Sequence, residues 1–302
     1  MLSYLLPVLS VVLAWWAGTA LILHLDGLPR TTFGRSMRQA TVLMLGALAG
    51  LALTADSREP HAAYAAFGCA LVLWGWLEMS FLMGFITGPR KMHCDESARG
   101  WPRFRAAVGT LLYHEIALAL GALLVLMLTW QADNRVGLWT YIVLWVMRTS
   151  AKINVFLGVR NLSEAFLPEH LRYLETYFRR APMNMFFPVA VTGATIALTV
   201  ILFRMPSASA DVFGFTATML VGSLLFLAVL EHWCMVMPFP VDALWSLGLR
   251  SRLRPTANRE NPDVSRRGRA NRVTPPVVGP PLLLAEALHR DLAPSAPERS
   301  GR

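Results

Sequence analysis

Seven stretches of the chain are apolar over a length that matches the hydrocarbon core of a membrane. A core about 30 Å thick is crossed by roughly 20 residues of helix. The stretches run about 2–25, 39–55, 62–88, 106–130, 138–159, 183–205 and 212–237. With 55% hydrophobic and only 16% charged residues and a mean hydropathy of +0.45, the chain is too apolar for an ordinary soluble domain. The sequence therefore predicts an all-α, polytopic integral membrane protein of about seven transmembrane helices.

Basic residues are divided unevenly between the two ends of these stretches. If the N-terminus lies outside, the linkers 26–38, 89–105 and 160–181 and the tail place 23 bases on one face. The opposite face receives only Arg58, Arg135 and Arg204. Since cytoplasmic loops carry the excess of Lys and Arg, the protein is expected to be N-out and C-in. The first stretch has no basic n-region and no small-residue cleavage site, so we expect it to be a retained anchor rather than a signal peptide.

The chain divides into a predicted transmembrane bundle, residues 1–249, and a tail, residues 250–302. The tail holds eight prolines and 11 arginines against five acids. Such a segment cannot bury enough apolar surface to become ordered, so we expect a disordered cytoplasmic tail near anionic headgroups. Most of the net charge of +9 comes from this tail, and it is no indication of nucleic-acid binding. Cys69, Cys94 and Cys234 have no paired spacing and are expected to be reduced thiols.

The linker 160–181 has a helical pattern of its own. One side is apolar: Leu162, Phe166, Leu171, Leu174 and Phe178. The other side carries charges, namely Glu169, Arg172, Glu175, Arg179 and Arg180. This pattern predicts a cytoplasmic amphipathic helix on the inner leaflet, with Tyr173 and Tyr177 as interface anchors. The alternative is an ordinary loop between two helices.

Ionisable residues inside the apolar stretches form one predicted layer. They are Glu78, His114, Glu115, Arg148, Lys152, Glu231 and His232. Counting about 1.5 Å per residue places all of them in the inner half of the bundle. Three glutamates face one arginine and one lysine, so a proton, a cation or a ligand is needed for neutrality. The alternative is that Glu–Arg and Glu–Lys pairs only hold helices together.

The two histidines of this layer are the candidate ligands. A neutral imidazole of His114 or His232 can bind a metal ion or the magnesium of a chlorin. Each histidine is directly next to a glutamate in the sequence. Adjacent residues on a helix point about 100° apart and cannot present both side chains to one ion, as a Glu-x-x-His pair can, so a di-metal carboxylate site is poorly supported. The chain has no phosphate-binding Gly-Lys loop, no G-x-S-x-G and no H-E-x-x-H. No catalytic residue is therefore assigned, and the identity of any metal is open.

Three segments resemble one known family. They are KINVFLGVRNLSEAFLPEHLRYLETYFRRAPMNMFFPVAV at 152–191, GFITGPRK at 84–91 and EHWCMVMPFPVDALW at 231–245. Over roughly residues 1–250 the chain is similar to the PuhE family of photosynthetic complex assembly proteins of purple bacteria. The resemblance implies a multi-pass protein of the bacterial inner membrane, cytoplasmic or intracytoplasmic. It also implies a link to reaction-centre assembly and bacteriochlorophyll supply, with reaction-centre subunits or bacteriochlorophyll-synthesis enzymes as partners.

Three functions are compatible with these observations. We expect a non-catalytic assembly or regulatory factor that binds partner proteins or a pigment, bacteriochlorophyll or a precursor, through the polar layer. The second possibility is a membrane enzyme in which Glu78, Glu115 or Glu231 carries a proton to or from a tetrapyrrole, a quinone or a lipid. The third is a proton-coupled transporter through the same layer.

Overall fold

The chain folds into helices, as the apolar stretches predict. The computed structural model describes residues 2–162, 164 and 167–238, and the predicted tail lies outside them. The long helices are α1 (Leu2–Asp26), α2 (Phe33–Thr54), α3 (Pro60–Leu82), α4 (Gly100–Leu128), α5 (Val136–Leu157), α6 (Phe186–Phe203) and α7 (Val212–Val236). Two 3-10 helices, η1 (Arg30–Thr32) and η3 (Glu169–Tyr177), lie in the connections. Within the described residues there is no strand, so the all-α prediction is confirmed.

Six of the long helices in the described part are long and apolar enough to cross a membrane. The remaining one, α5, is 22 residues long and carries Arg148 and Lys152. It packs against α3, α4, α6 and α7, and therefore lies inside the bundle despite its charges. These helices are those of a multi-pass membrane protein; the count of seven crossings depends on α5 and stays a prediction.

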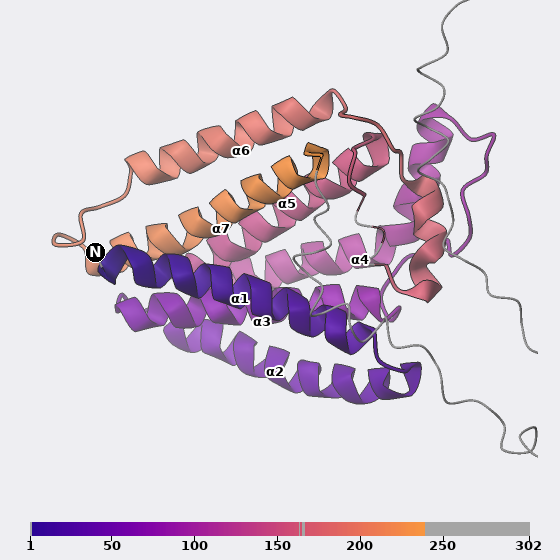
Figure 1. The fold of residues 1–302 in the computed structure, drawn as a ribbon. Helices are drawn as coiled ribbons and strands as arrows, with labels where there is room; N and C mark the ends of the chain where they lie inside the picture. The colour runs from indigo at the N-terminus through magenta and orange to yellow at the C-terminus, as the bar shows by residue number, and fades with distance from the viewer. Residues whose placement is uncertain (1, 163, 165–166, 239–302) are drawn as a thin grey trace, which may run out of the picture. The chain divides into compact units, whose positions relative to one another are not determined.

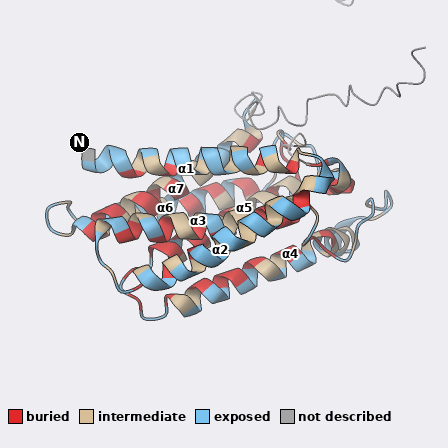
Figure 2. Cartoon of the chain, turned by 90° about the horizontal axis from the view of Figure 1, so that it is seen from below, coloured by how far each residue is buried: buried red, intermediate tan, exposed pale blue. Residues whose placement is uncertain are grey.

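The centre of the bundle is formed by α3, α5 and α7, which contact one another. Around them, α1 lies against α3 and α7, α2 against α3, α4 against α3 and α5, and α6 against α7 (Figure 1). Half or more of the apolar windows of α3 and α7 is buried, 56% and 50%, compared with 11% for α1, α2 and α6. Figure 2 shows the same contrast, with most of α1 and α2 exposed. The outer helices therefore present most of their surface to the surroundings.

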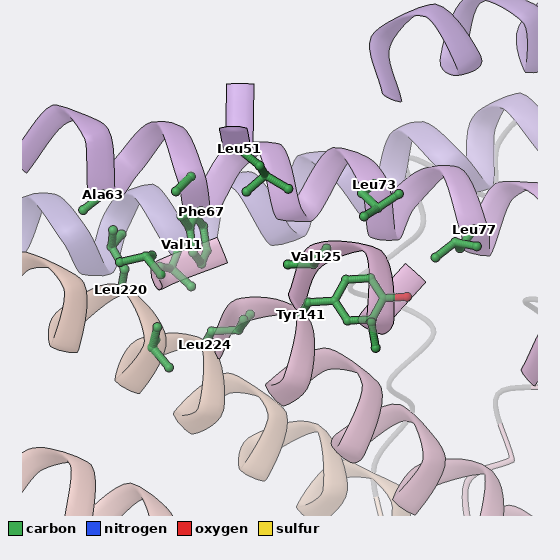
Figure 3. Packing of buried hydrophobic residues seen from close by; sticks show 14 of the residues in the cluster. Val11, Leu51, Ala63, Phe67, Leu73, Leu77, Val125, Tyr141, Leu220 and Leu224 are labelled. Carbon is green, nitrogen blue, oxygen red and sulfur yellow. The ribbon is translucent and has the colours of Figure 1, made fainter. Parts of the chain in front are cut away.

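Close packing in the centre depends on one tyrosine and one glycine. Tyr141 on α5 is fully buried and its hydroxyl donates a hydrogen bond of 2.8 Å to the carbonyl oxygen of Leu118 on α4. A Cβ at Gly121 would overlap this hydroxyl, so α4 can approach α5 only with glycine there. Figure 3 shows Tyr141 beside Val125 and Leu77, with Leu220 and Val11 farther along the same core.

Consecutive long helices run in opposite directions, so α1, α3, α5 and α7 end where α2, α4 and α6 begin (Figure 1). We call this the basic end of the bundle, because it carries the three basic linkers.

At this end the structure corrects the predicted boundary of the third apolar stretch. The third apolar stretch was expected to be helical to about residue 88, but α3 ends at Leu82 and Gly84 turns the chain with a φ of 82°. Hydropathy does not distinguish a helix from an apolar loop, and residues 84–90 form a loop in which Thr87 and Gly88 are buried and Phe85 and Pro89 are exposed.

Candidate functional site

Two ion pairs lie inside the bundle toward the basic end. Arg148 Nη2 lies 3.2 Å from Glu78 Oε2 on α3, and Lys152 Nζ lies 2.7 Å from Glu115 Oε1 on α4. The two bases are one helical turn apart on α5, so neighbouring side chains of one helix can reach two different helices. The pairs therefore connect the central α5 to both α3 and α4. We call these four residues together with His114 the polar cluster.

His114 is the enclosed member of the polar cluster. Its side chain is 0% exposed, and its Nε2 lies 3.9 Å from Glu78 Oε1, which is too long for a hydrogen bond. Neither ring nitrogen has a hydrogen-bond partner, nor does Glu78 Oε1. The ring of Phe81 lies against the imidazole with 4.7 Å between ring centroids. Because His114 is fully enclosed, a flat macrocycle such as a chlorin could reach it only if surrounding side chains moved.

His232, the second predicted ligand, lies in a different environment. Its Nδ1 is 2.9 Å from the carbonyl oxygen of Ala228, and its Nε2 is 3.0 Å from Ser150 Oγ. A carbonyl only accepts, so Nδ1 carries the proton and neutral Nε2 accepts from the serine hydroxyl. Both nitrogens are thus occupied, and His232 joins α7 to α5. Binding of a metal or pigment here would require the loss of the bond to Ser150.

Glu231 completes the set of seven predicted residues and stands apart. Its side chain is exposed on α7, and no ion pair is found for it among the described residues. It is close enough to Arg148 for a longer-range attraction, and 41% of the Arg148 side chain is itself exposed. The charge surplus of the predicted layer therefore lies on one exposed carboxylate, beside a half-exposed arginine.

The loop 84–90 positions α4 within the cluster. Its backbone forms two hydrogen bonds with α4, from Arg90 N to the carbonyl of Gly109 (3.1 Å) and from His114 N to the carbonyl of Thr87 (2.9 Å). A Cβ at Gly88 would overlap the backbone of Gly109 and Thr110, so the approach requires glycine. Sequence reasoning missed this contact, although Gly84 and Gly88 with Pro89 are typical of a turn.

The linker 160–181 contains the predicted amphipathic helix, but its apolar side faces the protein. In η3, Leu171, Tyr173 and Leu174 are buried in a cluster with Phe81 of α3. The prediction that Tyr173 and Tyr177 are membrane-interface anchors is therefore wrong. Burial raises the pKa of Tyr173. The hydroxyl of Tyr177 accepts a hydrogen bond from Arg90 Nε at 2.8 Å and donates one to the carbonyl of Met92 at 3.0 Å, so Tyr177 is bound to the segment after α3.

The predicted charged side of this linker does face outward. Glu169, Arg172, Arg179 and Arg180 are exposed, and Glu175 is half-buried. Arg180 Nη2 contacts both carboxylate oxygens of Glu164 at 3.0 Å. The pattern thus predicted which side is charged. It did not show that the opposite side would be covered by α3 and α4.

No group of three or more His, Cys, Asp or Glu side chains in the described part of the chain is placed to hold a metal ion. A shallow groove of about 510 Å³ does occur, between α6 and Trp233 of α7. Its lining includes Thr192, Thr195 and Thr199, and none of the seven predicted residues. This groove therefore does not coincide with the polar cluster.

Comparison with known proteins identifies the chain at the level of its family. The family model described as protein of unknown function (DUF3623) matches residues 1–256. The chain belongs to the DUF3623 family. A curated relative from Rhodobacter capsulatus, described as an uncharacterized 30.4 kDa protein in the puhA 5′ region, is 39% identical over 250 residues, which cover 82% of this chain and 91% of the relative. The resemblance to PuhE is thereby confirmed. No solved structure matches the chain.

In this DUF3623 protein, the segments that carry the resemblance form a junction at the basic end. Asn184 Nδ2 donates to Asn154 Oδ1 (3.0 Å) and to the carbonyl of Gly158 (2.9 Å), while its Oδ1 accepts from the backbone of Phe186 and Phe187 at the start of α6. These bonds join the end of α5 to the beginning of α6.

A second asparagine of the same junction closes α7. Asn161 Nδ2 donates to the carbonyls of Cys234 and Met237, at 2.6 and 2.7 Å. Because the last carbonyls of a helix have no partner within it, this side chain satisfies that of Cys234, and it also binds the carbonyl of Met237, which follows the helix. The long motif at 152–191 therefore encodes the junction of three helix ends next to the polar cluster.

Proposed function

We propose that this DUF3623 protein is a non-catalytic membrane factor that assists photosynthetic reaction-centre assembly and modulates bacteriochlorophyll supply. A relative encoded in the puhA region suggests a photosynthesis-related role. The observation that carries the proposal is the open side of the polar cluster, where Arg148 is 41% exposed and Glu231 is exposed without an ion pair among the described residues. Glu231 lies on α7, which is long and apolar enough to cross a membrane, and Arg148 lies on α5, which also carries Lys152.

Exposed charge at this depth requires a polar neighbour. A charged side chain at the centre of a transmembrane helix costs about 2.5 to 3.5 kcal/mol on insertion scales. Glu231 supplies an exposed carboxylate, and Arg148 supplies the exposed part of its side chain, while its unpartnered Nε is buried. A partner helix with an amide side chain, which both donates and accepts, or a pigment with a polar substituent would satisfy the exposed charges of both groups. A binding surface for such a partner is what an assembly factor needs.

The ion pairs do not favour the enzyme or transporter alternatives. A carboxylate that carries protons must be able to change its charge, and a paired base opposes protonation. Glu78 and Glu115 are each paired, at 3.2 and 2.7 Å. This leaves Glu231, which is exposed and lies in no enclosed reaction site.

The test is purification from photosynthetically grown cells in a mild detergent, followed by absorption spectroscopy and immunodetection of reaction-centre subunits. We expect the wild type to retain reaction-centre subunits or bacteriochlorophyll, and Glu231→Gln to reduce this retention about tenfold, as loss of one charged contact of about 1.4 kcal/mol would do. Glu96→Gln, an exposed carboxylate in the loop before α4, is the matched control and should retain both. Equal retention by wild type, Glu231→Gln and Arg148→Gln would refute the proposed binding surface.

A further inference from the structure

A surface around the start of α4, at the basic end, combines aromatic and basic side chains. It consists of Arg99, Trp101, Arg103, Phe104 and Arg105, together with Phe156 of α5; we call it the basic-aromatic surface. With 29 residues, α4 is about 43 Å long at 1.5 Å per residue, whereas the hydrocarbon core is about 30 Å thick. Its opposite end is apolar up to Leu128, so the excess length falls at its charged start. The first two turns of α4 therefore lie at the depth of lipid headgroups.

The aromatic rings of this surface are arranged in a continuous row. Trp101 and Phe104 are stacked with centroids 5.2 Å apart, and Phe104 meets Phe156 edge-on at 5.7 Å. The guanidinium of Arg103 lies 4.8 Å from the centre of the Phe156 ring. Trp101 is 66% exposed and Phe104 37% exposed, although both are large and apolar. Tryptophan in this setting is typical of a membrane–water interface, where one part of the ring is wet and the other is not.

The bases of this surface form no ion pair within the described residues, although Asp95 lies close enough to attract Arg99. Arg99 donates only to the carbonyls of Glu96 and Ala98, and Arg103 to those of Tyr177 and Phe178. None of the ion pairs found in the described part includes Arg99, Arg103 or Arg105. The first turn of α4 contains no acidic residue either. Arg99 and Arg105 therefore remain available to an anion, while the guanidinium of the half-buried Arg103 is engaged by these carbonyls and by Phe156.

The apolar continuation of the surface identifies the class of this anion. Phe104, Val108, Leu112 and Ile116 recur every four residues along α4, and all are exposed, by 37%, 37%, 38% and 48%. A soluble phosphate would use the bases and leave this stripe unoccupied. An amphiphile whose anionic group is attached to long alkyl chains matches both parts. We propose that the basic-aromatic surface binds an anionic phospholipid, with its phosphate at Arg99 and Arg105 and its acyl chains along the stripe.

The proposal is tested with phosphatidylglycerol, phosphatidylcholine of the same acyl chains, and glycerol 3-phosphate, each added to the detergent-solubilised full chain during thermal unfolding. We expect phosphatidylglycerol alone to raise Tm. The double variant Arg99→Gln/Arg105→Gln should bind it about 25-fold more weakly, because each base near an anionic surface contributes about a factor of five. Arg35→Gln/Arg38→Gln, which removes two exposed bases at the same end from α2, is the matched control and should keep the full shift.

Three results would overturn the proposal. Equal shifts with the two lipids would show that charge is not recognised, and a shift with glycerol 3-phosphate would indicate a soluble phosphate instead. If the Arg35→Gln/Arg38→Gln control lost the Tm shift to the same extent as the double variant, the effect would come from net charge in general. If the double variant fails to fold, quenching of tryptophan fluorescence by brominated lipids gives a second measurement. Brominated phosphatidylglycerol should quench the wild type more than brominated phosphatidylcholine, and Trp101→Phe should abolish this difference; its persistence would refute the site.

Discussion

Arg148 on α5 reaches Glu78 on α3 across 3.2 Å, yet 41% of the arginine side chain is exposed while the glutamate side chain is only 10% exposed. The carboxylate is therefore enclosed by protein, and the base has one side toward the bundle and the other toward its surroundings. Each half of the pair depends on the other differently. Glu78 without Arg148 is a charge in an apolar interior, whereas Arg148 without Glu78 can still reach toward polar groups outside.

This asymmetry predicts the outcome of breaking the pair. We expect Arg148→Gln to lower the free energy of unfolding more than Glu78→Gln, because it strands the buried carboxylate. Removal of one partner from a fully buried pair costs about 3 to 5 kcal/mol, and the half-exposed arginine should reduce the cost of Glu78→Gln to about 2 kcal/mol. The double variant should be more stable than Arg148→Gln. Unfolding in detergent of the wild type, the two single variants and the double variant gives the coupling free energy between Arg148 and Glu78. If the two single losses of stability simply added up in the double variant, the pairing would be contradicted.

The contact between the loop 84–90 and α4 yields a prediction in which two glycines respond with opposite sign. Gly88→Ala places a Cβ against the backbone of Gly109 and Thr110, which cannot move aside. We expect it to cost about 1 to 3 kcal/mol of stability, as overpacking does. Gly109→Ala meets only the Cβ and Cδ of Arg90, at 3.5 and 3.9 Å, which are ordinary contacts, and should stabilise α4 by up to about 1 kcal/mol. Thermal unfolding of both variants decides, and a tolerated Gly88→Ala would show that the loop is not closely docked.

The polar cluster was partly predictable because depth along a helix can be read from sequence. Arg148 and Lys152 are four residues apart, so both had to point to one side of α5, at the heights where Glu78 and Glu115 were expected. Direction around a helix is not given by depth, however. Glu231 and His232 are at similar heights, but one is exposed and the other contacts Ser150, whose hydroxyl carries no sequence signal of its own.

The connections were less predictable than the helices for a related reason. An apolar side on the linker 160–181 has the same pattern whether it faces lipid or protein. The burial of Tyr173 and Tyr177 depends on residues more than 60 positions earlier, namely Phe81 and the loop after α3. Likewise, the roles of Asn154, Asn161 and Asn184 depend on carbonyls of several helices that meet only in the fold.

The asparagine junction predicts a loss of stability that capping alone would not explain. Asn184→Ala removes the cap of α6, worth about 0.5 to 2 kcal/mol, together with three bonds to the end of α5. Asn184→Asp keeps the oxygen that accepts from Phe186 and Phe187 but turns a second oxygen toward Asn154 Oδ1 and the Gly158 carbonyl. We expect Asp to be as destabilising as Ala in thermal unfolding. Wild-type stability of Asn184→Asp would show that only the cap matters.

The membrane topology can be tested with two thiols on either side of α4, α5 and α6. Cys94 lies in the loop before α4, and Ser209 is exposed between α6 and α7. In a chain with Cys69 and Cys234 replaced by alanine, a membrane-impermeant maleimide should label Ser209→Cys in intact spheroplasts, and Cys94 only after lysis, since the basic end is expected in the cytoplasm. Opposite sides require an odd number of crossings between the two thiols, so α5 must span the membrane in spite of Arg148 and Lys152. Labelling of both thiols on one side would show that α5 does not cross, and labelling of Cys94 alone would reverse the predicted orientation.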